Sequence, residues 1–256
     1  MSQEFWSRQA SLPGLRAVID PNDDVGRKNA YIDCLHKTAL RRYGKFRRRD
    51  RVLDFGCGLG RLSVWLADRV GSVHGVEANL DMLRQAKRLF HQGEYRNVSS
   101  TLYDGTRLPF ANDAFTRVNS VWVLQHVLDD DQLRFVLGEL RRVCGPLARM
   151  VFLERTSKEP DEAWLPKRVI IRRPYDKYQA AFVDAGLRCV MAKPIWDLGP
   201  ICGSPRIDRL VKSGRLPSAT YPALARLDMA TKPWRAETES TDYIFVCEKE
   251  PATPSP

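Results

Sequence analysis

Residues 52–61 constrain this chain more than any other segment. They read Val-Leu-Asp-Phe-Gly-Cys-Gly-Leu-Gly-Arg, an apolar run that reaches Asp54 and is followed by glycine at positions 56, 58 and 60. Glycines lose much conformational entropy on folding, so a loop this rich in them must use the missing Cβ atoms. Their usual use is to let backbone N–H groups approach a ligand at a helix N-terminus. The segment therefore predicts a strand–loop–helix unit that binds a ligand.

Two nucleotide-binding patterns do not fit this loop. A dinucleotide fingerprint requires Gly-x-Gly-x-x-Gly/Ala, and here the third position is Arg61, which is too large for close helix–strand packing. A phosphate-binding loop requires Gly-x-x-x-x-Gly-Lys-Ser/Thr, and the sequence contains no such string. A tight strand–helix turn without a ligand is the alternative on these residues alone.

Strands and helices alternate regularly after the loop. Apolar and β-rich runs predict strands, and stripes of period 3.6 predict the helices between them. This alternation is typical of parallel βαβ units with helices on both faces of an α/β, doubly wound sheet. The predicted strands are 51–55, 72–77, 98–103, 115–123, 148–154, 187–191 and 241–249.

The length of 256 residues allows one large domain with additions. Residues 1–50 are interpreted as an N-terminal extension or lid, irregular at first and with a helix over 31–43. The main domain is expected over 51–250, with a proline-rich cap insertion at about 192–240 that lies beside the site. The tail 251–256 is expected to be disordered.

Composition narrows the class of protein further. Hydrophobic residues make up 43% of the chain, but no run is long and apolar enough for a transmembrane helix, and no secretory signal is visible. The six cysteines form no Cys-x-x-Cys pair, which favours reduced thiols over disulfides or a zinc site. We therefore expect a cytoplasmic protein with no metal site.

The net charge of +10 is concentrated in residues 41–51, Arg-Arg-Tyr-Gly-Lys-Phe-Arg-Arg-Arg-Asp-Arg. A solvated helix end and loop is the favoured interpretation of such a run. Nucleic acid, an acidic lipid surface and a phosphate-bearing substrate are the alternative anionic partners.

Acidic residues stand at the ends of three successive predicted strands, at Asp54, Glu77 and Asp104. The carboxyl ends of strands in an open parallel sheet line one crevice, so these three side chains are expected to converge. A carboxylate about twenty residues beyond the glycine loop is placed to accept hydrogen bonds from a ribose diol.

With these residues, the chain resembles the class I S-adenosylmethionine (SAM)-dependent methyltransferases. The similarity covers residues 51–155 well and extends more weakly to 249. It rests on the glycine loop and on three further segments, His74–Asn79, Leu102–Gly105 with Leu108–Phe110, and Phe115–Val127. This chain departs from the family pattern at Thr116, because the fourth strand of the family usually has Asp at that position. The resemblance implies a mostly parallel seven-stranded sheet whose last strand, at 241–249, is antiparallel between its neighbours.

The resemblance also implies how the methionine part of SAM is held. Gly56, Gly58 and the nearby backbone would bind it, and Asp54 would organise the loop. Arg61 would pair with the methionine carboxylate or pack at the sheet edge.

For the rest of SAM the resemblance implies six contact residues. Glu77 would bind the ribose hydroxyls, and Ala78 and Met82 would touch adenine. The adenine edge would be read by Asp104 and the Gly105 amide. Ser120 would offer a backbone contact near the sulfonium.

A general base is needed for many methyl acceptors. His126 follows the fourth strand, where the crevice is expected, and its ordinary pKa of about 6.5 suits proton abstraction near neutrality. The alternative is a structural histidine at the start of a helix. Glu154 and Arg155, at the end of the fifth strand, are interpreted as a structural ion pair.

The resemblance therefore predicts a SAM-dependent methyltransferase. The acceptor is expected to be a small molecule or a glycan-type compound, because the predicted cap insertion would enclose a pocket. RNA or protein methylation is the alternative suggested by residues 41–51, with nucleic acid less favoured as a partner. A non-catalytic SAM-binding scaffold is the alternative of another class. The acceptor itself and the oligomeric state do not follow from the sequence.

Overall fold

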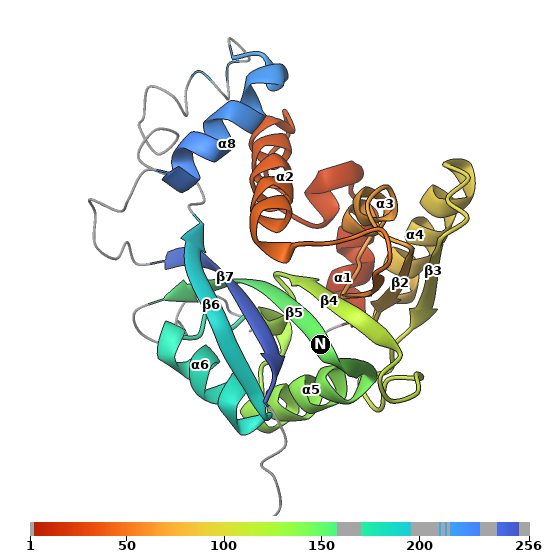
Figure 1. Ribbon diagram of the computed structural model, residues 1–256. Coiled ribbons are helices and arrows are strands. Elements are labelled where there is room, and N and C mark those ends of the chain that lie inside the picture. Colours follow the sequence, from red (N-terminus) through yellow and green to blue (C-terminus); the bar gives the residue numbers. More distant parts are fainter. Residues whose placement is uncertain are drawn as a thin grey trace, which may run out of the picture.

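The described part of the chain contains one seven-stranded sheet (Figure 1). A computed structural model describes residues 3–157, 170–195, 210, 213, 216–230 and 240–250. The strand order is β3-β2-β1-β4-β5-β7-β6, and β7 runs antiparallel to both β5 and β6. This confirms the predicted doubly wound sheet with an antiparallel last strand. The strands are β1 (Arg51–Phe55), β2 (Ser72–Glu77), β3 (Val98–Leu102), β4 (Phe115–Val121), β5 (Cys144–Ser157), β6 (Leu187–Ile195) and β7 (Ser240–Lys249).

Helices cover both faces of this sheet. α5 and α6 lie below it in Figure 1, and α2, α3 and α4 lie above. The main apolar cluster joins α5 and α6 to the sheet, with Phe182 stacked on Phe152 at 5.1 Å between ring centroids. The helices are α1 (Gln3–Ala10), α2 (Arg27–Ala39), α3 (Arg61–Ala67), α4 (Leu80–Gln92), α5 (Asp130–Val143), α6 (Tyr175–Asp184) and α8 (Tyr221–Ala230). Shorter turns are η1 (Gly14–Ala17), η2 (Leu40–Gly44), η3 (Leu124–His126) and η4 (Ser218–Thr220).

Local sequence signals explain where the helices that flank the site begin. The side chain of Asn79 accepts hydrogen bonds from the N–H groups of Asp81 and Met82, which caps α4. Asp129 caps α5 in the same way, by accepting from Gln132 N at 2.8 Å. Both helices start directly after the strand-end segments that carry predicted site residues, so their caps fix the positions of those segments.

The N-terminal segment contains a helix that its irregular sequence did not predict. α1 packs against α4, where Ala10, Ala17 and Met82 are buried together with Trp6 beside them. Asn79 Nδ2 also donates to Ser7 Oγ at 3.1 Å. With only eight residues, α1 gives too little periodicity to be detected, and its position depends on these contacts with α4.

The second half of the chain adds α8, which packs on α2. The rings of Tyr31 and Tyr221 meet edge to face at 5.8 Å. Most of the predicted cap insertion, and the predicted disordered tail 251–256, lie outside the described residues. The boundaries proposed for the domain and its additions stay predictions.

Two findings bear on the class of protein. No helix among the described residues is both long and apolar enough to cross a bilayer. Five of the cysteines lie in the described ranges, and all five are free thiols; Cys202 lies outside those ranges.

Candidate active site

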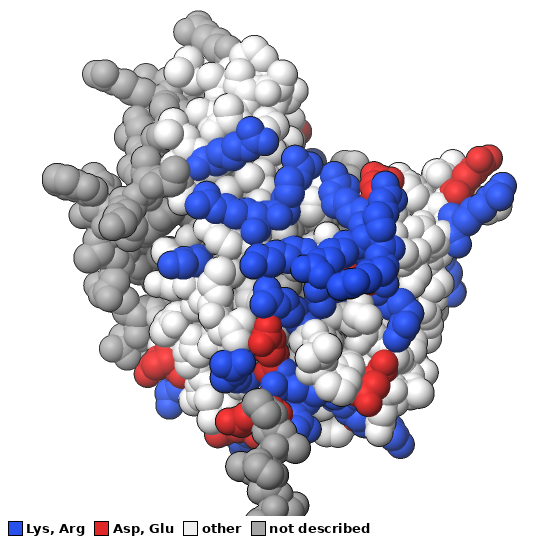
Figure 2. Space-filling model, viewed as in Figure 1, with Lys and Arg blue, Asp and Glu red and all other residues white. Residues whose placement is uncertain are grey.

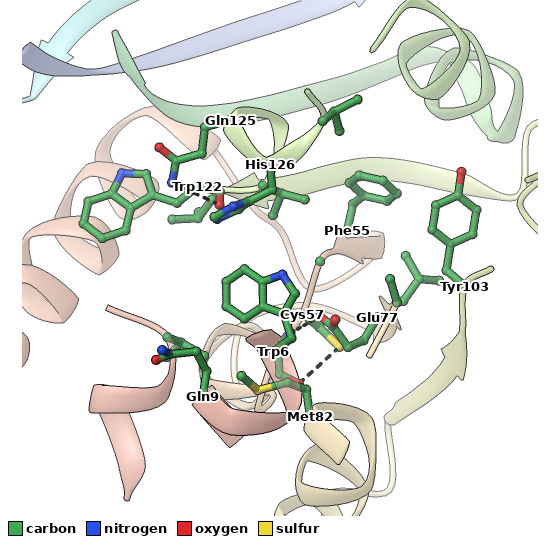
Figure 3. A pocket seen from close by; sticks show the side chains of 18 of the residues that line it. Trp6, Gln9, Phe55, Cys57, Glu77, Met82, Tyr103, Trp122, Gln125 and His126 are labelled. Atoms are coloured by element: carbon green, nitrogen blue, oxygen red, sulfur yellow. Dashed lines mark hydrogen bonds between the residues drawn. The ribbon is translucent and has the colours of Figure 1, made fainter. Parts of the chain in front are cut away.

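A cavity of about 770 Å³ lies at the carboxyl ends of β1, β2 and β4. Its floor contains the glycine loop after β1 and the end of β2, and the segment after β4 forms one wall. α1 and η1 close it from the other side (Figure 3). This is the crevice where an open parallel sheet is expected to bind its ligand.

The glycine loop adopts a backbone that requires glycine. Gly56, Gly58 and Gly60 have φ values of +70°, +56° and +80°. A Cβ on Gly56 would lie 2.4 Å from a methyl group of Val123, and one on Gly60 would lie 2.5 Å from the ring of Phe90. The loop is therefore pressed between the wall after β4 and helix α4, while its remaining face lines the cavity.

Asp54 anchors this loop from below. It is buried, and its carboxylate accepts from Ser63 Oγ at 2.5 Å and from Asn119 Nδ2 at 2.7 Å. Burial raises the pKa of this carboxyl, although both hydrogen bonds act in the opposite direction. Its main contacts therefore lie within the protein, and it ties β1 to α3 and β4.

Glu77 joins the glycine loop to the start of α4. One carboxylate oxygen accepts from Gly58 N and the other from Asn79 N, both at 2.9 Å. Burial raises the pKa of Glu77, whereas these backbone donors lower it. A carboxylate can accept about four hydrogen bonds, and Glu77 lines the cavity, so it keeps acceptor capacity for a ligand. Ala78 and Met82 line the cavity next to it.

Arg61 lines the cavity, but its guanidinium already has partners on α2. Nη1 lies 2.7 Å from Asp33 Oδ1, and Nη2 lies 3.3 Å from Nδ1 of His36. His36 is fully buried, and burial followed by the charge of Arg61 lowers its pKa well below the usual value. Neutral His36 can accept the Arg61 hydrogen bond, so Arg61 connects the glycine loop to α2.

Two predicted cofactor residues are not among those that line the cavity. Asp104 is exposed, and its carboxylate accepts from Thr106 N at 2.9 Å and from Thr106 Oγ1 at 2.5 Å. Ser120 is fully buried within β4. Their neighbours in the chain do line it: the predicted Gly105 after β3, and Val121 at the end of β4. The predicted convergence of three carboxylates is therefore seen for Asp54 and Glu77 only.

Two buried side chains, one acidic and one basic, hold the segment after β4. Glu154 accepts from the backbone N–H groups of Val123, Leu124 and Gln125 at 2.9–3.2 Å. Arg173 donates to the carbonyl groups of Leu124 and Val127. The interpretation of Glu154 and Arg155 as an ion pair is wrong in this respect: Glu154 binds backbone, and Arg155 Nε binds Asp242 at 3.0 Å. The spacing of the sequence cannot show this, because the partners of both residues are distant in the chain.

His126 ends this clamped segment and lines the cavity. Its ring meets the ring of Trp6 edge to face, with 4.8 Å between centroids. Figure 3 shows Trp6 from α1 and His126 from η3 next to each other at the cavity. Trp6 was not among the predicted site residues. The sequence signal available was a tryptophan in an irregular N-terminal segment, which does not by itself indicate a binding site.

The clamp makes the stability of the fold depend on pH. Burial raises the pKa of Glu154 to about 8. The folded protein therefore holds this proton between about pH 4.5, where an unfolded glutamate ionises, and about pH 8. Because the folded state binds more protons than the unfolded state, this contribution to stability is full below pH 4.5 and is lost as the pH rises to 8.

We expect the substitution Glu154→Gln to remove that contribution. Urea unfolding between pH 5 and 9 should show a smaller fall in the free energy of unfolding for the variant than for the parent protein. Equal slopes over pH 5–8 would show that Glu154 is ionised in the folded state.

The cavity residues fit a SAM cofactor. A side chain at position 56 would collide with Val123 in the cavity wall, so glycine keeps the loop backbone at the cavity, and Glu77 beside it keeps acceptor capacity. The buried indole Nε1 of Trp6 has no hydrogen-bond partner in the described structure, and its residue lines the same cavity. A ligand with a diol and further acceptor groups would satisfy both.

Comparison with known proteins gives the same family. Residues 52–147 match a family model described as a methyltransferase domain. The chain is 35% identical over 106 residues to the methyltransferase GfsG of Streptomyces halstedii, a match that covers 41% of this chain and 37% of that one. It is 30% identical over 142 residues to a demethylmenaquinone methyltransferase of Lactobacillus johnsonii, with 54% of each chain covered. The chain thus spans about half or less of these relatives.

The fold is also shared with solved structures. The geranyl diphosphate C-methyltransferase of Streptomyces coelicolor superposes with a TM-score of 0.65, at 16% identity and with 96% of each chain covered. That structure contains S-adenosyl-L-homocysteine. The glycine loop, the sheet order and the family match agree: residues 52–147 match a methyltransferase domain, and these findings support a class I SAM-dependent methyltransferase with SAM as its cofactor.

Proposed function

We propose that this protein transfers the methyl group of SAM to a small molecule with a largely apolar surface. The observation that carries this proposal is the roofed cavity of about 770 Å³. Sites for single drug-sized ligands have volumes of roughly 300–1,000 Å³, so this cavity is large enough for an acceptor beside the cofactor. Beyond the glycine loop its walls are mainly apolar and aromatic, including Phe5, Trp6, Val18, Ile19, Leu62, Trp122, Val123 and Ile170.

The donor half of the cavity is formed by the glycine loop and the end of β2. Gly56 and Gly58 would hold the methionine part of SAM, with Asp54 fixing the loop. Glu77 would accept from the ribose hydroxyls, and Met82 would contact adenine. When bound, SAM supplies a methyl group activated on a sulfonium.

The acceptor half faces the segment that Glu154 and Arg173 clamp. Trp6 and Trp122 would exclude water and orient the acceptor, because methyl transfer requires close alignment of donor and acceptor. His126 would take the proton of a hydroxyl, phenol or amine acceptor. Its hydrogen-bonded backbone, 2.9 Å from N to Val123 O, keeps it at the cavity wall.

Replacing His126 with alanine is expected to lower turnover about a hundredfold without weakening SAM binding, because general-base catalysis contributes about 10²–10⁴-fold. Turnover with saturating acceptor and calorimetric titration with SAM measure the two quantities. As a control, Gln132→Ala removes another polar side chain that lines the cavity, and it should leave the pH profile of turnover unchanged. Unchanged turnover in His126→Ala would exclude His126 as the base.

A small molecule is favoured over the other acceptors by the walls of the cavity. A glycan requires several polar groups for its hydroxyls, whereas most lining residues here are apolar. An RNA base or a protein side chain would have to pass α1 and η1, which form the roof. The scaffold alternative is disfavoured because the glycine loop and Glu77 are both present and in contact.

Transfer of labelled methyl groups tests the proposal. The protein is incubated with methyl-labelled SAM and a cell extract, and the products are separated into low-mass organic, RNA and protein fractions. We expect the label in a low-mass compound that resists nuclease and protease. Label in RNA or protein would contradict the small-molecule acceptor. The absence of label from all three fractions would favour the scaffold alternative.

A further inference from the structure

Basic side chains crowd the edge of the sheet that lies opposite the cavity. Figure 2 shows Lys and Arg gathered over the segment from η2 to β1. Seven of these residues are exposed and, within the described structure, none forms an ion pair with a carboxylate. We call this surface the basic edge; its residues are Arg41, Arg42, Lys45, Arg47, Arg48, Arg49 and Arg51.

Further arginines lie near the basic edge. Asp50, the acidic residue within the segment 41–51, already has partners. Burial lowers the pKa of Arg69, and the charges of Arg41 and Arg48 lower it further. Asp50 is buried, accepts from the backbone N of Arg47 at 2.7 Å and lies 3.5 Å from Nε of Arg117.

The acids that border the basic edge also have partners. Asp68 lies 3.8 Å from Arg69, and Glu248 lies 2.8 Å from Arg149. The exposed charges of the basic edge are therefore not cancelled by these carboxylates.

A recess of about 270 Å³ continues the basic edge between the starts of β1, β2 and β3. Arg51 and Arg96 line it, and no Asp or Glu does. His74, on its floor, lies 2.8 Å from both Ser99 Oγ and Thr101 Oγ1, and burial lowers its pKa. The recess thus joins two guanidinium groups to polar, uncharged neighbours, which suits a phosphate group.

These features favour nucleic acid over a lipid bilayer. Six of the seven basic-edge residues are arginine, whose planar guanidinium matches phosphate oxygens in pairs. Binding to a bilayer surface also uses apolar side chains that enter it. Here Tyr43 and Phe46 are half-buried and pack against the core, and no exposed large hydrophobic residue belongs to the basic edge.

The basic edge and the cavity lie at opposite ends of the sheet. Arg51 begins β1, whereas the cavity starts at the other end of that strand, beyond a length of roughly 16 Å for five residues. We propose that the basic edge is a nucleic-acid binding surface that holds the phosphate backbone of a single strand, separate from the methyl-transfer site.

Fluorescence anisotropy with a labelled mixed-sequence RNA of about twenty nucleotides tests this, with KCl varied between about 50 and 200 mM. Each phosphate contact with a single strand contributes about 0.7 to the slope of log affinity against log salt. The triple variant Arg47→Gln, Arg48→Gln and Arg49→Gln should therefore reduce that slope by about 2 and weaken binding about tenfold or more at low salt. A single-stranded DNA of the same sequence should behave similarly, because contacts to phosphates do not read the sugar.

A second triple variant on α4 serves as a matched control. Arg84→Gln, Lys87→Gln and Arg88→Gln remove the same charge from another exposed surface and should leave the slope nearly unchanged. Arg96→Gln tests the recess alone, and an unchanged SAM affinity in each variant shows that it is folded. S-adenosylhomocysteine should not alter RNA affinity.

Three results would overturn the proposal. These are no RNA binding by the parent protein, equal losses in the two triple variants, or binding to vesicles that contain phosphatidylglycerol without binding to RNA.

Discussion

SAM affinity is expected to fall about a hundredfold when Glu77 is replaced by alanine. Two hydrogen bonds from the ribose to a charged acceptor contribute about 1.5–3 kcal/mol each, and every 1.4 kcal/mol is about tenfold in affinity. The same carboxylate also holds Gly58 N and Asn79 N at 2.9 Å, so its loss loosens the loop and the start of α4. Calorimetric titration with SAM measures the effect.

Two further variants make this measurement specific. Glu77→Gln keeps the size of the side chain and should show an intermediate loss, because an amide places a donor where a second acceptor was. Asp104→Ala removes the exposed carboxylate that the sequence also predicts as a cofactor contact. From its position outside the cavity lining we expect less than about a threefold change. A larger loss for Asp104→Ala than for Glu77→Ala would reverse the assignment.

Gly56→Ala is expected to have the second large effect, on stability as well as on binding. A left-handed backbone costs about 1–2 kcal/mol for a residue with a Cβ, and overpacking adds about 1–3 kcal/mol. Here φ is +70°, and the added Cβ would lie 2.4 Å from Val123. Relief of that clash would push the wall after β4 away from the glycine loop, so SAM binding should also be lost. Urea unfolding and calorimetry measure the two effects.

Gly14→Ala separates the backbone effect from the clash. Gly14 has φ of +55°, but nothing lies within 4 Å of the position of its Cβ. This variant should lose only the backbone contribution of about 1–2 kcal/mol and should keep its SAM affinity. Similar losses of stability in the two variants would show that contact with Val123 is unimportant.

Local patterns predicted the sheet because each strand and helix shows its own periodicity. β1 and β2 have the expected bounds, 51–55 and 72–77. The position of β7 between β5 and β6 came from the family resemblance, since the order of strands in a sheet is a long-range property. The predicted strand 187–191 continues to Ile195, because pairing with β7 extends it beyond its apolar run.

The sequence predicted residues of the candidate site only where they lie in a local sequence motif. Glu77 and the glycine loop lie in recognisable segments and meet as expected. Trp6 and Arg173 were missed because contacts with α4 and with the segment after β4 place them, and neither has a local pattern. Asp104 follows a strand like the other two acids, but Thr106 turns its carboxylate back on its own loop. The spacing of acidic residues in the sequence does not reveal hydrogen bonds of this kind within a loop.

A crystal structure with S-adenosylhomocysteine tests the central claim most directly. The cavity between the glycine loop and α1 should contain the ligand, with the ribose hydroxyls on Glu77 and the adenine beside Met82. Space should remain next to Trp6 and His126 for the acceptor. A ligand bound elsewhere, or one whose ribose does not contact Glu77, would contradict the proposed donor site.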